Sequence, residues 1–138
     1  DNCRTPMIWE DKTKGGFTKD EIHPWLPLST DPSAVNVADQ IPDPNSLLNW
    51  YKELLILRNS SPVLQSGSLS LLPKNKAKDG LLGYVRDFEN ERLTVLINLA
   101  PTPIDYKIQI NQIISQTGAA THKQGSITLG GYSGAIIR

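Results

Sequence analysis

The first 42 residues show no sustained helical or strand periodicity, although they contain large apolar side chains. Five prolines interrupt this segment, at positions 6, 24, 27, 32 and 42. Loops longer than about 15 residues are uncommon in compact domains unless they serve a function. Trp9, Phe17 and Trp25 need apolar surroundings, and the polar sequence around them offers few. We therefore expect this segment to pack against a part of a larger protein that lies outside these 138 residues.

A helix is predicted after this segment. Asp43 is a suitable N-cap, Pro44 fits the first helical position, and Ser60 to Pro62 provide a stop. The apolar positions extend around more of the helix than the roughly 100° stripe of an ordinary surface helix. They are Leu47, Leu48, Trp50, Tyr51, Leu54, Leu55 and Leu57. This width indicates a helix that is covered on two sides.

From Val63 onward the pattern changes to a period of two, which is typical of half-buried strands. Alternation is clear over 104–111 and over 92–99, and the polar residues 89–91 link the latter to 81–88 as a hairpin. Further short strands are expected at 68–72, 126–129 and 135–138, while 110–114 fits either a strand end or a turn. The pattern predicts an all-β antiparallel sandwich over residues 63–138.

Several short motifs in the first half occur in a specific order. These motifs are Arg4–Trp9, Gly16–Thr18, Pro24–Pro27, Val35–Val37 and Ser46–Leu54. Together they resemble the C-terminal part of the alpha-amylase superfamily of glycoside hydrolases, in the pattern of its oligo-1,6-glucosidases and alpha-glucosidases. Ile8 departs from that pattern, which usually has Gln at this position. The resemblance implies that residues 1–62 are the end of a (β/α)₈ TIM barrel, a long loop plus the last helix, followed by the C-terminal β-sandwich domain.

The resemblance also implies where the chemistry occurs. Enzymes of this family hydrolyse α-glucosides with retention, using an aspartate nucleophile, a glutamate acid/base and a second aspartate at the ends of barrel strands. Nothing in these residues matches those motifs, so we expect no catalytic residue in this chain and no activity from the chain alone. The acidic clusters at 10–11, 20–21 and 87–91 are interpreted as solvated loop charge.

Two residues are connected to the sugar site by the resemblance. Asp1 and Arg4 are expected in the wall of the substrate pocket. Arg4 either braces the loop through its planar guanidinium group or contacts the substrate directly. Trp9 and Trp25 either pack against the barrel or lie at the substrate entrance, since aromatic faces stack on sugar rings.

Composition limits the partners. Fourteen basic and fourteen acidic residues give a net charge of zero, so neither nucleic acid nor a membrane is an expected partner. His23 and His122 lack companions at ligand spacing, so we expect no metal and no cofactor. Cys3 is the single cysteine, which favours a reducing, cytoplasmic location, while a secreted protein stays open as the alternative. The expected partners are an α-glucoside oligosaccharide, bound through the parent barrel, and the remainder of the same polypeptide.

Two other classes of protein stay open. One is a non-catalytic relative, the amylase-like heavy chain that accompanies an amino-acid transporter. The other is a stand-alone carbohydrate-binding sandwich that retains part of a loop. The sequence preceding residue 1 distinguishes the first alternative from an enzyme, through the presence of the three acids and of a transmembrane helix. Tryptophan fluorescence titrated with maltose tests the second.

Overall fold

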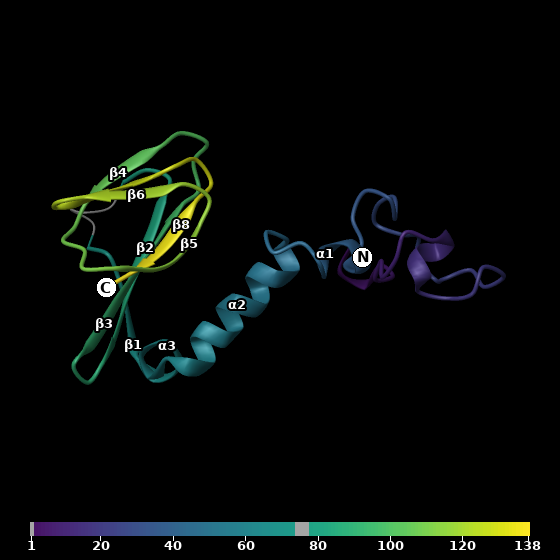
Figure 1. Ribbon diagram of the computed structural model, residues 1–138, viewed down its shortest axis with the longest axis horizontal. Coiled ribbons are helices and arrows are strands. Elements are labelled where there is room, and N and C mark those ends of the chain that lie inside the picture. Colours follow the sequence, from purple (N-terminus) through teal and green to yellow (C-terminus); the bar gives the residue numbers. More distant parts are fainter. Residues whose placement is uncertain (1, 74–77) are drawn as a thin grey trace. The chain divides into compact units, whose positions relative to one another are not determined.

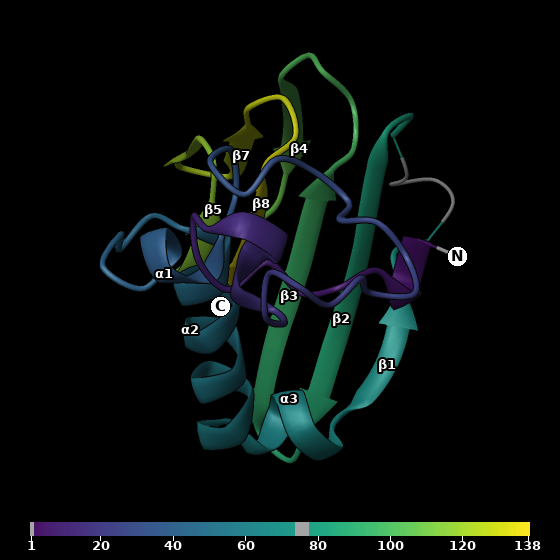
Figure 2. The ribbon, with the colours of Figure 1, turned by 90° about the vertical axis from the view of Figure 1, so that its right-hand side faces the viewer.

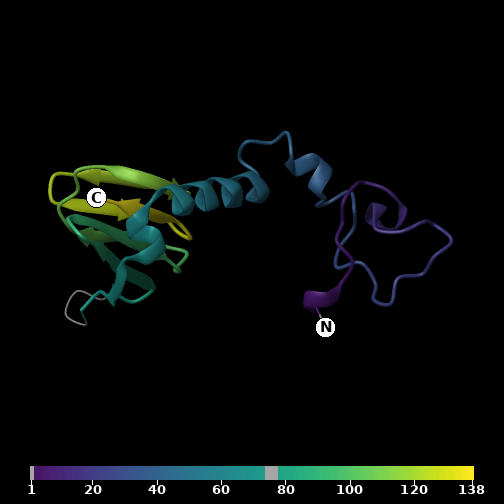
Figure 3. The same ribbon diagram turned by 90° about the horizontal axis from the view of Figure 1, so that it is seen from below.

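The computed structural model describes residues 2–73 and 78–138 and divides the chain into two compact units, Asp1–Leu57 and Arg58–Arg138. Asp1 and residues 74–77 lie outside the described residues. Unit 1 contains two 3₁₀ turns and two helices: η1 (Asn2–Arg4), η2 (Thr13–Gly16), α1 (Val37–Gln40) and α2 (Leu47–Ser60), the last of which crosses into unit 2. Figure 3 shows the irregular course of the chain before α1. The predicted division into barrel and C-terminal domain at residue 62 stays a prediction.

Helix α2 begins three residues later than the predicted start at Pro44. The chain makes a turn over Asp43–Ser46, in which the Asp43 carboxylate accepts a hydrogen bond from the Asn45 N–H at 2.9 Å. Ser46 then caps the helix, because its hydroxyl accepts a hydrogen bond from the Asn49 N–H at 3.2 Å. The predicted stop is confirmed, since α2 ends at Ser60. Pro62 begins the short helix α3 (Pro62–Ser66).

Among its described residues, unit 2 contains eight strands in two antiparallel sheets, in addition to α3 and the end of α2 (Figure 1). The five-stranded sheet has the order β1-β2-β3-β8-β5 and the three-stranded sheet the order β4-β7-β6. The predicted hairpin is confirmed, with Phe88 opposite Glu91 at its closed end. The strands are β1 (Ser68–Leu71), β2 (Leu81–Phe88), β3 (Glu91–Asn98), β4 (Ile104–Lys107), β5 (Ile113–Thr117), β6 (Ala120–Lys123), β7 (Ser126–Leu129) and β8 (Gly134–Ile137).

One hydrophobic core joins the two sheets. Leu96, Ala135 and Ile137 from the five-stranded sheet meet Tyr106, Ile127 and Leu129 from the three-stranded sheet. Ile108 and Ile110, which were predicted to continue the strand from Ile104, still pack against this core although β4 ends at Lys107. The period-two pattern therefore predicted the inward-facing side chains as far as Ile110, three residues beyond the end of β4.

Strand β3 is buried on both faces, which a half-buried strand would not be. Thr94, Leu96 and Asn98 lie on the face toward the core, whereas Leu93 and Val95 lie on the other face and are also buried. Helix α3 packs against β2 and β3 and buries Val63 and Leu64 (Figure 2). Its position next to the sheet explains why apolar residues occupy both alternating sets in β3.

Within the described ranges, no helix is both long enough and apolar enough to cross a bilayer.

Candidate functional site

The two motifs at either end of the unit 1 loop lie side by side. The Val37 N–H donates to the Ile8 carbonyl at 3.0 Å, and the Ala38 N–H donates to the Trp9 carbonyl at 2.9 Å. Asn36, 2% exposed, accepts a hydrogen bond from the Asp39 N–H and thereby caps α1. The segment from Arg4 to Trp9 is thus fixed to the segment from Val35 to Val37, although the bonded residues are 29 positions apart in sequence.

Gly15, which directly precedes the Gly16–Thr18 motif, is held against the same segment. The Trp9 N–H donates to the Gly15 carbonyl at 2.7 Å, and the Glu10 N–H donates to the same oxygen at 3.2 Å. Gly15 has a φ of 63°, which favours glycine, and a Cβ there would lie 3.2 Å from the Ile8 Cα and Cγ2 atoms. Ile8 is 7% exposed. Ile8 occupies the position where the family pattern usually has glutamine, and at this buried position an amide group would be removed from water.

Arg4 contacts an aromatic ring from a fourth motif, Pro24–Pro27. Its guanidinium carbon lies 4.9 Å from the centre of the Trp25 ring. This distance is within the range of a cation–π contact, which contributes about 0.5–1 kcal/mol at an exposed site. Trp25 is 74% exposed within this chain. The contact links η1 to the Pro24–Pro27 turn, so that four of the ordered motifs form one connected loop structure.

Two open hollows accompany these contacts. One, of about 230 Å³, lies beside Ile8 and Asn36 and is also lined by Thr5, Ser29 and Thr30. The other, of about 490 Å³, is lined by His23 and Trp25 together with Lys14 and Pro27. Among the described residues that line them, neither hollow has a carboxylate side chain. These hollows can accept an apolar or hydroxylated surface, but they lack the pair of carboxylates that glycoside hydrolysis requires.

Local hydrogen bonds shift the pKa of two exposed groups in unit 1, Lys12 and Asp31. Glu10 pairs with Lys12, and the hydrogen bond from the ammonium group raises the pKa of Lys12. The backbone N–H and hydroxyl of Ser33 both donate to Asp31 and lower the pKa of that carboxylate. Throughout residues 2–73 and 78–138, no group of His, Cys, Asp or Glu side chains could hold a metal ion. Asp1, the second predicted pocket residue, lies outside the described residues.

The sequence alone did not predict the contact between Arg4 and Trp25. The order of the motifs identified both residues as part of one pattern, but an aperiodic loop gives no register from which a contact 21 positions apart could be read. Trp9, the other aromatic residue considered, is 48% exposed and is fixed through its backbone.

Comparison with known proteins places this loop in a family. Residues 1–67 match the family described as the alpha amylase catalytic domain. The chain belongs to the alpha-amylase family, and it corresponds to a C-terminal part of its glycosidases. It is 37% identical over 100 residues to a probable alpha-glucosidase of Rhizobium meliloti, covering 72% of this chain and 17% of that protein. It is 29% identical to an oligo-1,6-glucosidase of Bacillus cereus, covering 100% of this chain and 25% of that protein.

Solved structures of sugar-converting enzymes are similar to this chain over nearly its whole length. A mutant isomaltulose synthase from Erwinia rhapontici NX5, in complex with D-glucose, matches with a TM-score of 0.89 at 28% identity. The trehalulose synthase from Pseudomonas mesoacidophila MX-45 matches with a TM-score of 0.89 at 26% identity. Each match covers 99% of this chain and 25% of the solved chain. The chain thus spans a quarter or less of the length of these four relatives.

Proposed function

We propose that these residues belong to a retaining alpha-glucosidase that removes terminal α-linked glucose from short oligosaccharides. The catalytic aspartate and glutamate are supplied by other parts of the polypeptide, and residues 1–62 complete the (β/α)₈ barrel. In this proposal the carboxylates lie roughly 5 Å apart, so that one attacks the anomeric carbon while the other protonates the departing oxygen. The β domain follows as the C-terminal domain.

The main support is the match to the catalytic-domain family over the loop and helix that the motifs define. Relatives with 30% identity or more are named as glucosidases, among them an alpha-glucosidase of Schizosaccharomyces pombe and an oligo-1,6-glucosidase of Parageobacillus thermoglucosidasius. Several carboxylates of unit 1 are engaged in local pairs and turns, such as Glu10 with Lys12 and Asp31 with Ser33. This arrangement supports a catalytic centre built from residues elsewhere.

Arg4 acts in this proposal as a brace for the pocket wall. Its contact with Trp25 supports the bracing role, because a planar guanidinium group stacked on a ring holds η1 against the Pro24–Pro27 turn. Arg4→Lys keeps the charge but loses the planar stacking surface. In the full-length enzyme we expect Arg4→Lys to lower the melting temperature by about 1 °C or less, because a contact of about 0.5–1 kcal/mol is small against the unfolding entropy of a large enzyme, while kcat/KM stays within about twofold.

A matched variant makes this test sharper. Trp25→Phe retains an aromatic ring for the cation and should have a smaller effect on melting than Arg4→Lys. A large fall in kcat/KM for Arg4→Lys, with an unchanged melting temperature, would instead assign Arg4 to direct substrate contact.

The proposed activity is tested with the full-length polypeptide and with these 138 residues alone, each incubated with maltose and isomaltose. Glucose released first as the α-anomer, detected by NMR, supports retention. Turnover by the 138-residue chain alone would overturn the proposal that the acids lie elsewhere. Lack of activity in the full-length polypeptide would favour the non-catalytic alternative.

A second candidate is isomerisation of sucrose. Similar solved structures are named isomaltulose and trehalulose synthases, and two of them are complexes with sucrose. The same full-length polypeptide incubated with sucrose distinguishes the two activities. Isomaltulose or trehalulose as the main product would favour isomerisation, whereas glucose and fructose in equal amounts would favour hydrolysis.

A further inference from the structure

Unit 2 contains an open cleft of about 770 Å³. Its floor is a row of side chains from adjacent strands of the five-stranded sheet, because Val85 pairs with Thr94 and Thr94 pairs with Ile137. The segment from Tyr106 to Gln109 forms the facing wall. Strands β2 and β3 are eight residues long, whereas β4 in the other sheet is four residues long. The hairpin of β2 and β3 therefore extends beyond β4, and part of its inner face is not covered by that strand.

The floor and wall are largely apolar. Val85, Ile108 and Ile137 contribute aliphatic surface, and Tyr106 is 3% exposed at the base. A concave site with an apolar floor and a few polar groups at its rim is the usual form of a small-molecule site.

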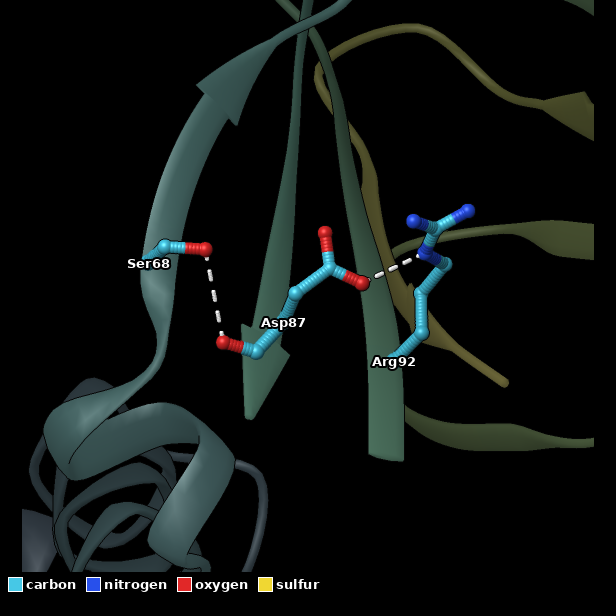
Figure 4. A network of polar contacts seen from close by, with 3 residues as sticks. All are labelled: Ser68, Asp87 and Arg92. Atoms are coloured by element: carbon cyan, nitrogen blue, oxygen red, sulfur yellow. Dashed lines mark hydrogen bonds and ion pairs between the residues drawn. The ribbon is translucent and has the colours of Figure 1, made fainter. Parts of the chain in front are cut away.

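The rim carries arginines whose charge is already balanced. The Arg92 Nε donates to the Asp87 carboxylate at 2.6 Å, and this is the contact that Figure 4 draws between the two side chains. Arg138 pairs with Glu91 through one of its terminal nitrogens. Both guanidinium groups therefore keep N–H donors for a ligand, while each positive charge is matched by a neighbouring carboxylate.

Amide side chains complete the rim. Asn90, Gln109 and Asn111 line the cleft, and each amide offers donors together with an acceptor. A hydroxyl group of a ligand requires both a donor and an acceptor from the protein, since it donates one hydrogen bond and accepts others. A phosphate or carboxylate needs donors and unbalanced positive charge, and among the described cations of the cleft only Lys107 is outside an ion pair. The rim therefore suits a neutral polyhydroxylated ligand better than an anion.

We propose that this cleft binds a neutral sugar, with one face of a glucosyl ring on the aliphatic floor and its hydroxyls on the amide and arginine groups of the rim. Tyr106, the aromatic residue among the described residues of the lining, is buried and exposes no ring face, so binding is weak, with a Kd of about 1 mM or higher. The site belongs to unit 2 and its occupancy can be measured without any catalytic activity.

The test is an NMR titration of the 138-residue chain with maltose, following backbone amide shifts. We expect saturable shifts at Thr94, Ile108 and Gln109. Gln109→Ala should raise the Kd at least fivefold. Gln112→Ala is the matched control, because Gln112 is a neighbouring exposed amide that does not line the cleft, and it should leave the Kd unchanged.

Two results would overturn the proposal. One is a response to maltose that stays linear, or that Gln109→Ala and Gln112→Ala alter equally. The other is a tighter response of the same amides to inorganic phosphate than to maltose, which would assign the cleft to anions. A preserved amide spectrum in both variants confirms that each is folded.

Discussion

Asn98 is a buried polar side chain that holds two turns of unit 2 together. It is 1% exposed, and its Nδ2 group donates to the carbonyls of Thr102 at 2.8 Å and Gly130 at 2.7 Å. Its Oδ1 accepts from the Ala100 N–H at 2.9 Å. One side chain thus satisfies backbone groups after β3 and after β7, which belong to different sheets.

We expect Asn98→Ala to lower the free energy of unfolding by about 2–3 kcal/mol, because it leaves several buried backbone groups without partners. Urea denaturation followed by far-ultraviolet circular dichroism measures this loss. Asn59→Ala, at an exposed asparagine near the end of α2, is the control and should change stability by less than about 0.5 kcal/mol. Equal effects of the two substitutions would contradict the bracing role of Asn98.

We expect Tyr106 to make the stability of unit 2 sensitive to alkaline pH. Burial raises the pKa of its phenol above the ordinary value of 10.0, because the charged form is poorly solvated in the core. Since the folded-state pKa is the higher one, the folded state binds more protons above about pH 10. Its contribution to stability is therefore complete below the unfolded-state pKa and is lost as the pH rises through the folded-state pKa.

Tyr106→Phe should consequently reduce the loss of stability between about pH 9 and about pH 11. The measurement is the urea midpoint of circular dichroism at several pH values. Tyr132→Phe serves as the control, because Tyr132 is 71% exposed, and it should retain the original pH dependence. Parallel curves for Tyr106→Phe and the parent chain would show that the phenol does not contribute.

Single residues were predictable from the sequence where a motif or an alternation identified them. The alternation places Tyr106 in the inward set of its strand, and the structure confirms it. The ordered motifs identify Arg4, but not its contact with Trp25, because that contact depends on how two turns of an aperiodic loop meet. The alternation places Asn98 in the set of its strand that lies opposite Leu93 and Val95. It does not predict that Asn98 is buried, because the backbone carbonyls that it contacts belong to turns outside the strand.

At the scale of elements, the sequence predicted helix α2 but placed its start about one turn too early. Asp43 and Pro44 fit the usual entry to a helix, yet the chain turns once more before Ser46. The Nδ2 group of Asn49 donates to the carbonyls of Gln40, Ile41 and Asp43 and fixes this extra turn. These contacts run between side chain and backbone, so no propensity rule predicts them.

Ser46→Ala should therefore destabilise α2 by about 1 kcal/mol, since it removes the cap and the hydrogen bond from the hydroxyl to the Gln40 carbonyl. Asp43→Ala should cost less, because the carboxylate is exposed and serves only the turn. Thermal melts at 222 nm compare the two variants. A larger effect of Asp43→Ala would restore Asp43 as the helix cap.

The strands were predictable to the extent that their side chains alternate. The hairpin of β2 and β3 was predicted, as were the regions of β1, β7 and β8. Strand β6 was not, since Ala120–Lys123 has no alternating apolar residues, and three of its four positions are exposed. Its place is set by pairing with β7 across a turn in which Gly125 has a φ of 80°. Edge strands of this kind depend on their neighbour rather than on their own sequence.

At the scale of the whole molecule, the two units differ in how much apolar surface they bury. Among the described residues, Ile8 is the one hydrophobic side chain in unit 1 that is buried, against eleven in unit 2. Each fully buried aliphatic or aromatic side chain contributes about 1.5–3 kcal/mol. Met7, Phe17 and Trp25 remain half or more exposed. This imbalance agrees with the sequence-based expectation that the loop packs against a further part of the protein.

Unit 1 should therefore unfold at lower urea concentration than unit 2 when the 138 residues are studied alone. All three tryptophans precede residue 58, so their fluorescence reports on unit 1 and α2, whereas hydrogen exchange of the β3 and β8 amides reports on unit 2. We expect the fluorescence transition to come first, because hydrogen bonds and one cation–π contact cannot replace a buried core. A single transition shared by both probes, with all three indoles shielded from an added quencher, would show that unit 1 has a core of its own and needs no further partner.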